Sequence, residues 1–181
     1  MRIISGSRRG KRLLWKTDAA TRPTKDRVRE SVFDVLAGKI DLNGVRVLDL
    51  FAGCGAYGLE SYSRGAGAVV LNDFDKEAYE IIKKNCRSIE CNATVLNLDF
   101  REALSRLKSR KFDLIFLDPP YKTSFIETSI EIIQKQGNLA PDGVIVAETE
   151  RELDLPFAIF KKYGRSMVYI VKLLEKNSTQ N

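Results

Sequence analysis

The chain has 181 residues, of which 44% are hydrophobic and 30% are charged, a composition typical of a globular domain. It has no apolar run of the roughly 18 residues that a membrane span needs and no apolar leader at its start, so we expect a cytoplasmic protein with no membrane partner. It contains no histidine, and its three cysteines have no paired CxxC spacing. These absences exclude Ser-His and Cys-His nucleophiles, and we expect no metal site.

Positive charge is concentrated at the beginning of the chain. Residues 1–30 hold ten Lys or Arg and three acidic residues, a net charge of +7, whereas the whole chain carries +6. Such a segment is typical either of an arm that binds a polyanion or of a solvated tail. The interleaved Ile3, Ile4, Leu13, Leu14 and Trp15 favour an ordered arm. The candidate polyanion contacts are Arg2, Arg8, Arg9, Lys11, Arg12, Arg22, Lys25, Arg27 and Arg29.

We expect residues 1–38 to form this basic extension, residues 39–176 to form the main domain, and residues 177–181 to be a polar tail. Residues 1–16 predict a β-hairpin whose turn is Gly6–Gly10. Thr24 is a predicted N-cap of a helix that ends near Ala37.

From residue 39 onward, short apolar runs alternate with helical stretches. The predicted strands are 45–51, 68–72, 94–98, 112–117 and 144–148, and the predicted helices are 57–64, one that ends near 86, 100–108 and 124–136. This alternation predicts a Rossmann-like α/β fold, with right-handed crossovers and helices on both faces of a mostly parallel sheet. Residues 157–163 and 167–174 predict an antiparallel hairpin at the end.

A glycine-rich turn follows the first predicted strand, where residues 49–58 have the sequence DLFAGCGAYG. Gly53, Gly55 and Gly58 match a dinucleotide-binding fingerprint, which is weak evidence when taken alone. Asp73 follows the second strand, where a carboxylate can accept both ribose hydroxyls of a nucleoside; Asp75 is the weaker candidate.

Asp99 follows the third strand and can accept a hydrogen bond from an adenine amino group, with Phe74 and Phe100 flanking the ring. Each of these acids could instead be a helix N-cap, although three at consecutive strand ends favour a shared ligand. Asp49 separates two cofactor classes, because a carboxylate there repels a pyrophosphate but suits a sulfonium and an α-amino group. This favours S-adenosylmethionine over NAD. The candidate cofactor contacts are Asp49, Phe51, Ala52, Gly53, Gly55, Asp73, Phe74, Asp99, Phe100, Asp118, Arg22 and Thr24.

The most specific motif is Asp118-Pro119-Pro120-Tyr121, which follows a buried strand. An exocyclic amine of a base is a weak nucleophile because its lone pair is delocalised. The Asp118 carboxylate and the Pro119 carbonyl can accept its two N–H groups, and Tyr121 can stack on the base, which is worth about 1–3 kcal/mol. All four residues are candidate catalytic residues; the plainer alternative is a loop stiffened by prolines. A Cys54 thiolate nucleophile is disfavoured, because no base activates it.

These motifs together resemble the RsmD family, bacterial methyltransferases that act on guanine N2 of small-subunit ribosomal RNA. The resemblance rests on residues 2–6, 9–10, 22–30, 49–53, 55, 58–60, 64–66 and 118–121, and the block 22–30 is its most specific part. Cys54, Tyr57 and Asp73 depart from the family pattern, which more often has serine, leucine and glutamate there.

The resemblance implies a seven-stranded methyltransferase sheet that uses S-adenosylmethionine, with RNA as the polyanion, presented in an assembled or assembling small ribosomal subunit. We expect a monomer. Three alternatives stay open: an adenine-N6 DNA or RNA methyltransferase, a non-catalytic RNA-binding assembly factor with this fold, and a nicotinamide oxidoreductase.

Overall fold

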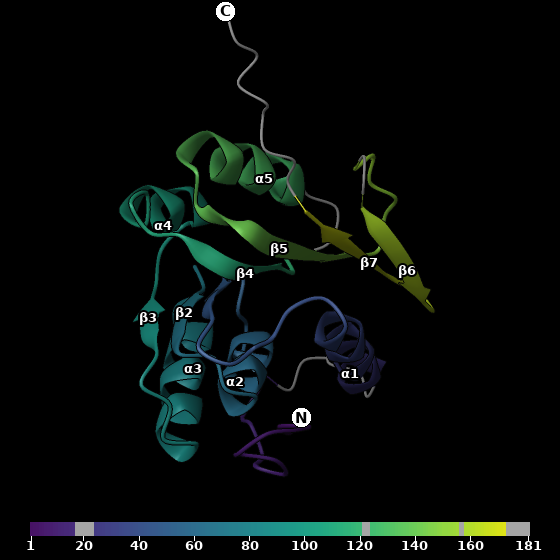
Figure 1. The fold of residues 1–181 in the computed structure, drawn as a ribbon. Helices are drawn as coiled ribbons and strands as arrows, with labels where there is room; N and C mark the ends of the chain where they lie inside the picture. The colour runs from purple at the N-terminus through teal and green to yellow at the C-terminus, as the bar shows by residue number, and fades with distance from the viewer. Residues whose placement is uncertain (17–23, 121–123, 156–157, 173–181) are drawn as a thin grey trace, which may run out of the picture.

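A computed structural model describes residues 1–16, 24–120, 124–155 and 158–172. Within these ranges a seven-stranded sheet has the order β3-β2-β1-β4-β5-β7-β6 (Figure 1). Strands β1 to β5 pair in parallel, and β7 is antiparallel to both β5 and β6. The strands are β1 Arg46–Asp49, β2 Ala68–Asn72, β3 Thr94–Leu96, β4 Phe112–Leu117, β5 Leu139–Thr149, β6 Ile159–Tyr163 and β7 Ser166–Val171. The predicted Rossmann-like sheet with its antiparallel C-terminal hairpin is confirmed.

Helices cover both faces of this sheet. The helices are α1 Thr24–Ala37, α2 Ala56–Ser63, α3 Lys76–Ser88, α4 Phe100–Arg106 and α5 Phe125–Gln136. Helices α1, α2 and α3 lie on one face and α4 and α5 on the other (Figure 1). Neighbouring residues of β4 alternate between the two layers: Phe116 packs with the α1–α2 layer and Leu117 with the α4–α5 layer. Double-sided burial explains why the strands are uninterrupted apolar runs.

The strand order reverses at β1, which pairs with β2 on one side and β4 on the other. In open α/β sheets the crevice for a ligand forms at the carboxyl ends of the strands beside such a switch point. The residues that follow β1 and β4 are therefore brought together although they are far apart in the sequence.

The N-terminal segment packs against the sheet domain. The predicted hairpin is present only as an isolated antiparallel bridge between Arg2 and Arg12, with Ile3 N–H donating to the Lys11 carbonyl at 2.9 Å and Leu13 N–H to the Met1 carbonyl at 3.1 Å. Ile3 and Leu13 are buried in the same core as α1 and α2. The Glu60 carboxylate of α2 also accepts the N–H groups of Ile4 and Ser5.

The start of β5 differs most from its prediction, because this strand begins at Leu139 and not at residue 144. Strands β1 and β3 are each shorter than predicted. Phe112 pairs with Leu139 but Leu114 pairs with Val144, so residues 140–143 form an irregular bulge between two paired stretches. Pro141 and Gly143 there interrupt the apolar pattern that predicted the strand. No helix within the described ranges is long and apolar enough to cross a membrane.

Candidate functional site

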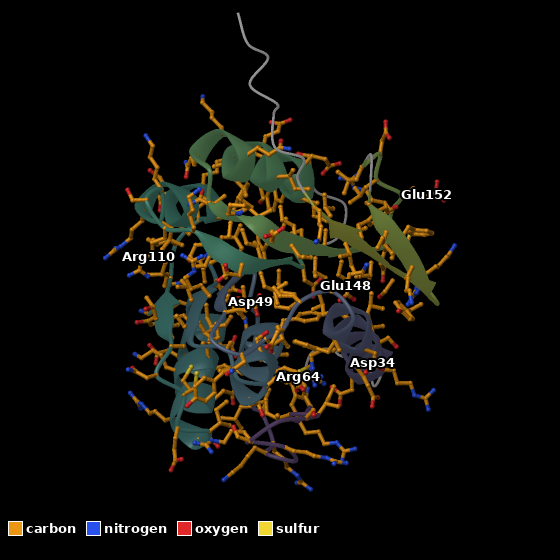
Figure 2. The ribbon with its side chains drawn as sticks, viewed as in Figure 1. Asp34, Asp49, Arg64, Arg110, Glu148 and Glu152 are labelled. Atoms are coloured by element: carbon orange, nitrogen blue, oxygen red, sulfur yellow. The ribbon has the colours of Figure 1, made fainter. Side chains whose placement is uncertain are left out.

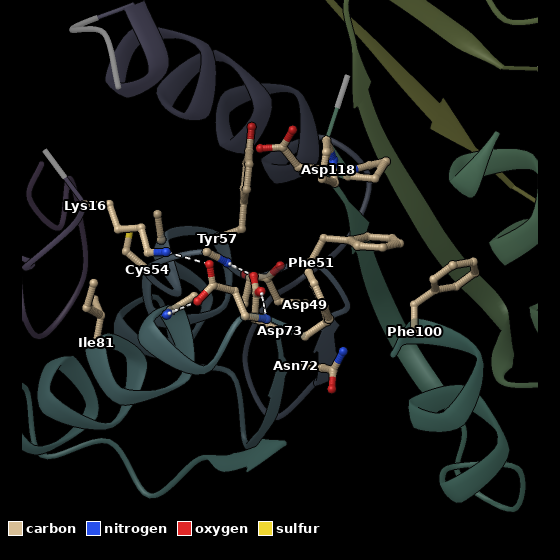
Figure 3. A pocket seen from close by; sticks show the side chains of 18 of the residues that line it. Lys16, Asp49, Phe51, Cys54, Tyr57, Asn72, Asp73, Ile81, Phe100 and Asp118 are labelled. Carbon is tan, nitrogen blue, oxygen red and sulfur yellow. Dashed lines mark hydrogen bonds and ion pairs between the residues drawn. The ribbon is translucent and has the colours of Figure 1, made fainter. Parts of the chain in front are cut away.

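A cavity of about 450 Å³ lies at the carboxyl ends of the central strands (Figure 3). Its size falls within the roughly 300–1,000 Å³ typical of small-molecule sites. The predicted site residues that line it are Asp49, Phe51, Ala52, Gly53, Asp73, Phe74, Asp99, Phe100, Asp118, Pro119 and Pro120. The structure thus brings the three strand-end acids and residues 118–120 of the predicted catalytic loop to one cavity.

The glycines of the first turn have distinct structural roles. Gly53 and Gly55 have left-handed φ angles of 58° and 84°, which side-chain-bearing residues rarely adopt. Gly58 lies within α2, and a Cβ there would stand 2.2 Å from Leu71 Cδ2. The third glycine therefore permits close packing of α2 on β2. The first two form the turn, in which Gly53 lines the cavity and Gly55 packs against Leu59.

Asp49 is a buried carboxylate at the end of β1, 1% exposed. Gly58 N–H donates a 3.0 Å hydrogen bond to its Oδ2. Burial raises the pKa of Asp49 to about 7, the Gly58 hydrogen bond opposes this increase, and the nearby Asp73 charge adds to it. This carboxylate suits a cation that enters the cavity, because a cation would compensate for its lost hydration.

Asp73 follows β2 on the other side of the glycine turn. It accepts the Gly53 N–H at 2.8 Å and the Asp75 N–H at 2.9 Å, so its carboxylate is held at the cavity in a fixed orientation (Figure 3). Asp75 instead caps α3 and pairs with Lys16. The helix-cap alternative thus holds for Asp75, which was the weaker candidate.

Asp99 combines both interpretations, because it caps α4 by accepting the Arg101 N–H at 2.9 Å and also lines the cavity. The two aromatic candidates differ. Phe74 is 76% exposed at the cavity, whereas Phe100 is 2% exposed and packs against Phe51 and Phe125. Phe100 is therefore part of a packed aromatic cluster in the wall of the cavity. Of the two candidates, Phe74 is the one whose ring is open to solvent.

The predicted catalytic loop leaves β4 directly into the cavity, where Asp118, Pro119 and Pro120 lie. Tyr121 and Arg22 lie outside the described residues. Thr24 and Lys25 begin α1, where only the backbone is described. Burial raises the pKa of Cys54, so its thiolate form is disfavoured, in agreement with the rejection of a cysteine nucleophile.

The predicted polyanion contacts whose side chains the structure describes fall into three groups. Arg8 is half-buried and donates to the Ile89 carbonyl and to Glu90. The assignment of Arg29 is wrong, because its side chain is 2% exposed and donates to the Arg2 carbonyl and to Asp26. It faces the cavity from inside the fold and is therefore unavailable to RNA phosphates on the outer surface. The exposed members are Arg2, Arg9, Lys11, Arg12 and Arg27.

Among the cavity residues that sequence reasoning missed are Tyr57 and Glu148, which contact each other. The Tyr57 hydroxyl donates to Glu148 Oε2 at 2.7 Å. Burial, and then the charges of Glu148 and Asp118, raise the pKa of Tyr57 well above its usual value. Glu148 ends a predicted strand, so the rule that selected Asp49, Asp73 and Asp99 could also have found it.

The fold and the site define a Rossmann-like methyltransferase, the class whose methyl donor is S-adenosylmethionine. Residues 1–172 match the family model described as Conserved hypothetical protein 95. YlbH of Bacillus subtilis is 41% identical over 160 residues, which cover 86% of each chain. Ribosomal RNA small subunit methyltransferase D of Escherichia coli is 36% identical over 157 residues, 86% of this chain and 78% of that protein. The chain belongs to the RsmD family.

Solved structures agree with this assignment. The structure of yhhF from Escherichia coli has a TM-score of 0.82 and 32% identity, and covers 94% of this chain and 96% of that chain. The Thermus thermophilus 16S rRNA N2 G1207 methyltransferase RsmC, in complex with AdoMet and guanosine, has a TM-score of 0.68 at 22% identity. That match covers 86% of this chain and 44% of the RsmC chain, and shows that the two share a fold.

Proposed function

We propose that this protein transfers a methyl group from S-adenosylmethionine to the exocyclic N2 of a guanine in small-subunit ribosomal RNA. The observation that carries the proposal is the placement of Asp49 and Asp118. Asp49 ends β1 and Asp118 follows the adjacent parallel strand β4, beside the switch point, and both line one cavity. One acid suits a cationic methyl donor, and the other suits the amine that receives the methyl group.

The lining residues fit the cofactor by charge and by shape. Asp49 supplies an anion for the sulfonium or α-amino group, Asp73 accepts the ribose hydroxyls, and Asp99 accepts the adenine amino group. The bare backbone at Gly53, where a Cβ would meet no atom within 4 Å, leaves room for close approach. RsmC, which has the same fold, forms a complex with AdoMet.

Asp118 and the Pro119 carbonyl then orient the amine. Hydrogen bonds from both N–H groups to these acceptors localise the nitrogen lone pair toward the methyl donor. This activation of the amine needs only positioning and electrostatics, and therefore no histidine. The cofactor supplies a methyl group that is already activated as a sulfonium. We assign stacking on the base to Tyr121.

The exposed part of the basic extension supplies the RNA contacts in this proposal. Arg2, Arg9, Lys11, Arg12 and Arg27 expose their side chains, which suits binding to phosphates. The names of relatives such as ribosomal RNA small subunit methyltransferase D support ribosomal RNA as the substrate. We propose that a monomer acts on an assembled or assembling small subunit, without a metal.

Nucleoside mapping by mass spectrometry tests this function. Small-subunit RNA from a strain that lacks the protein should lack one N2-methylguanosine, and purified protein with S-adenosylmethionine should restore it. New N6-methyladenosine would instead favour the adenine alternative. In a parallel thermal-shift measurement, S-adenosylhomocysteine should raise the melting temperature and NAD should not; the reverse would support an oxidoreductase.

A further inference from the structure

Glu148 is a buried carboxylate at the cavity. Its side chain is 3% exposed and lines the cavity with Asp118. Oε2 accepts the Tyr57 hydroxyl at 2.7 Å, whereas Oε1 has no hydrogen-bond partner among the described residues. An unpaired buried carboxylate oxygen is costly, so this atom indicates a missing donor.

The strand register places Glu148 beside Asp118. Leu117 of β4 is paired with Ala147 of β5, so Asp118 and Glu148 are the next residues on two adjacent parallel strands. Adjacent strands lie about 4.8 Å apart. Phe116 and Val146, two residues earlier on each strand, both pack in the α1–α2 layer. Because side chains alternate along a strand, Asp118 and Glu148 point to this same side; Figure 2 labels Glu148 at the end of its strand.

Two adjacent carboxylates require two adjacent donors on the ligand. In guanine the N2 amine is next to the ring N1–H, so the edge that carries the target amine presents N–H groups side by side. In adenine and cytosine the exocyclic amine is next to a ring nitrogen that only accepts hydrogen bonds. A carboxylate beside the amine-binding acid therefore attracts guanine and repels the other two bases with an amine.

We propose that Glu148 selects guanine by accepting the N1–H of the target base through Oε1, while Asp118 accepts from the N2 amine. This inference rests on the proposed function and extends it to base specificity. Tyr57 is a positioning residue: its hydroxyl holds Oε2, and its ring stacks on Phe116 at 4.7 Å between centroids, which orients Oε1 toward the base.

The test uses 2-aminopurine, which keeps the N2 amine but has an acceptor at N1. Small-subunit particles are reconstituted with guanine or 2-aminopurine at the position found by nucleoside mapping, and single-turnover methylation is measured with wild type and Glu148→Gln. Wild type should methylate guanine at least about 100-fold faster than 2-aminopurine, because 2-aminopurine would leave the buried Glu148 carboxylate without a hydrogen-bond donor. Glu148→Gln should reduce this ratio at least tenfold, since its amide can donate to the ring N1 of 2-aminopurine.

Tyr57→Phe is the matched control, because it keeps the carboxylate. It should slow methylation of both bases but still prefer guanine. S-adenosylhomocysteine should raise the melting temperature of both variants as it does for wild type, which shows that the cofactor site is folded. Equal methylation of the two bases by wild type, an unchanged ratio in Glu148→Gln, or the same loss of preference in both variants would overturn the inference. Failure of wild type to restore N2-methylguanosine would instead overturn the proposed function.

Discussion

Gly58 N–H donates a 3.0 Å hydrogen bond to Oδ2 of Asp49, and this contact connects the glycine turn to the buried acid of the site. The contact exists because α2 packs directly on β2, which requires glycine at position 58. One residue thus sets both the close packing of α2 and the environment of Asp49.

Asp49→Asn should abolish cofactor binding while stabilising the ligand-free protein at pH 8. Asparagine keeps the Gly58 hydrogen bond through its amide oxygen but carries no charge. In the folded wild type, burial raises the pKa of Asp49 from 3.8 to about 7. The folded state therefore binds this proton more tightly than the unfolded state. As the pH rises from about 4 to about 7, ionisation of the Asp49 carboxyl lowers the free energy of unfolding progressively.

Thermal melts check this prediction. Without ligand, Asp49→Asn should melt a few degrees above wild type at pH 8, and the difference should shrink toward pH 4. S-adenosylhomocysteine should stabilise wild type alone, with an affinity about tenfold weaker at pH 6 than at pH 8. A full ligand-induced shift in Asp49→Asn would show that the carboxylate does not contact the cofactor.

Asp118→Ala should reduce methyl transfer by about 100-fold or more, because nothing then orients the target amine. The dissociation constant of S-adenosylhomocysteine should stay within about threefold, since the lost contact is to the base. Asp113→Ala is a control on the same strand: Asp113 pairs with Arg46 at the opposite end of β4, away from the cavity. Retained activity in Asp118→Ala would refute the amine-orienting mechanism.

Neutralising Arg9, Lys11 and Arg12 together should weaken RNA binding and flatten its salt dependence. All three side chains are exposed, and three lost phosphate contacts should reduce the slope of log affinity against log salt by about 2. Substitution is preferable to deletion, because Ile3 and Leu13 of this segment belong to the core.

A control for the basic extension is the triple replacement of the exposed Lys108, Arg110 and Lys111, which removes the same charge before β4. Filter binding between 50 and 300 mM salt compares the two variants. An equal change of slope in both would mean that total charge, and not this segment, drives binding.

Glu60→Ala should lower the free energy of unfolding by about 3 kcal/mol, because three donors would lose a charged acceptor. The fully buried Glu60 carboxylate accepts Ile4 N–H at 2.7 Å, Ser5 N–H at 3.0 Å and Arg64 Nε–H at 2.8 Å. Urea denaturation gives the value. A loss below about 1 kcal/mol would show that the N-terminal segment is held by its apolar contacts alone.

Much of this fold could be predicted from local pattern. Alternating apolar runs and helical stretches located β2 and β4 at their observed bounds and predicted the parallel sheet, because burial on both faces leaves a clear sequence pattern. The sequence also predicted that Asp49, Asp73 and Asp118 belong to one site. The carboxyl ends of parallel strands share one edge of the sheet, so acidic residues at those ends lie close together. The bulge in β5 was not predictable, because it depends on where β5 pairs with β4.

The sequence by itself determined the class of fold, the family, and the strand ends at which the chemistry is placed, since these depend on patterns within a few residues. Only the tertiary structure decided which charged groups are accessible and which acids are partners. In the sequence Arg29 is indistinguishable from the exposed basic residues, whereas in the fold its side chain is buried. Tyr57 and Glu148 are 91 residues apart and meet because the Tyr57 ring lies against Phe116 of β4, next to the end of β5. Burial and pairing depend on contacts between distant segments, and short-range sequence patterns do not contain them.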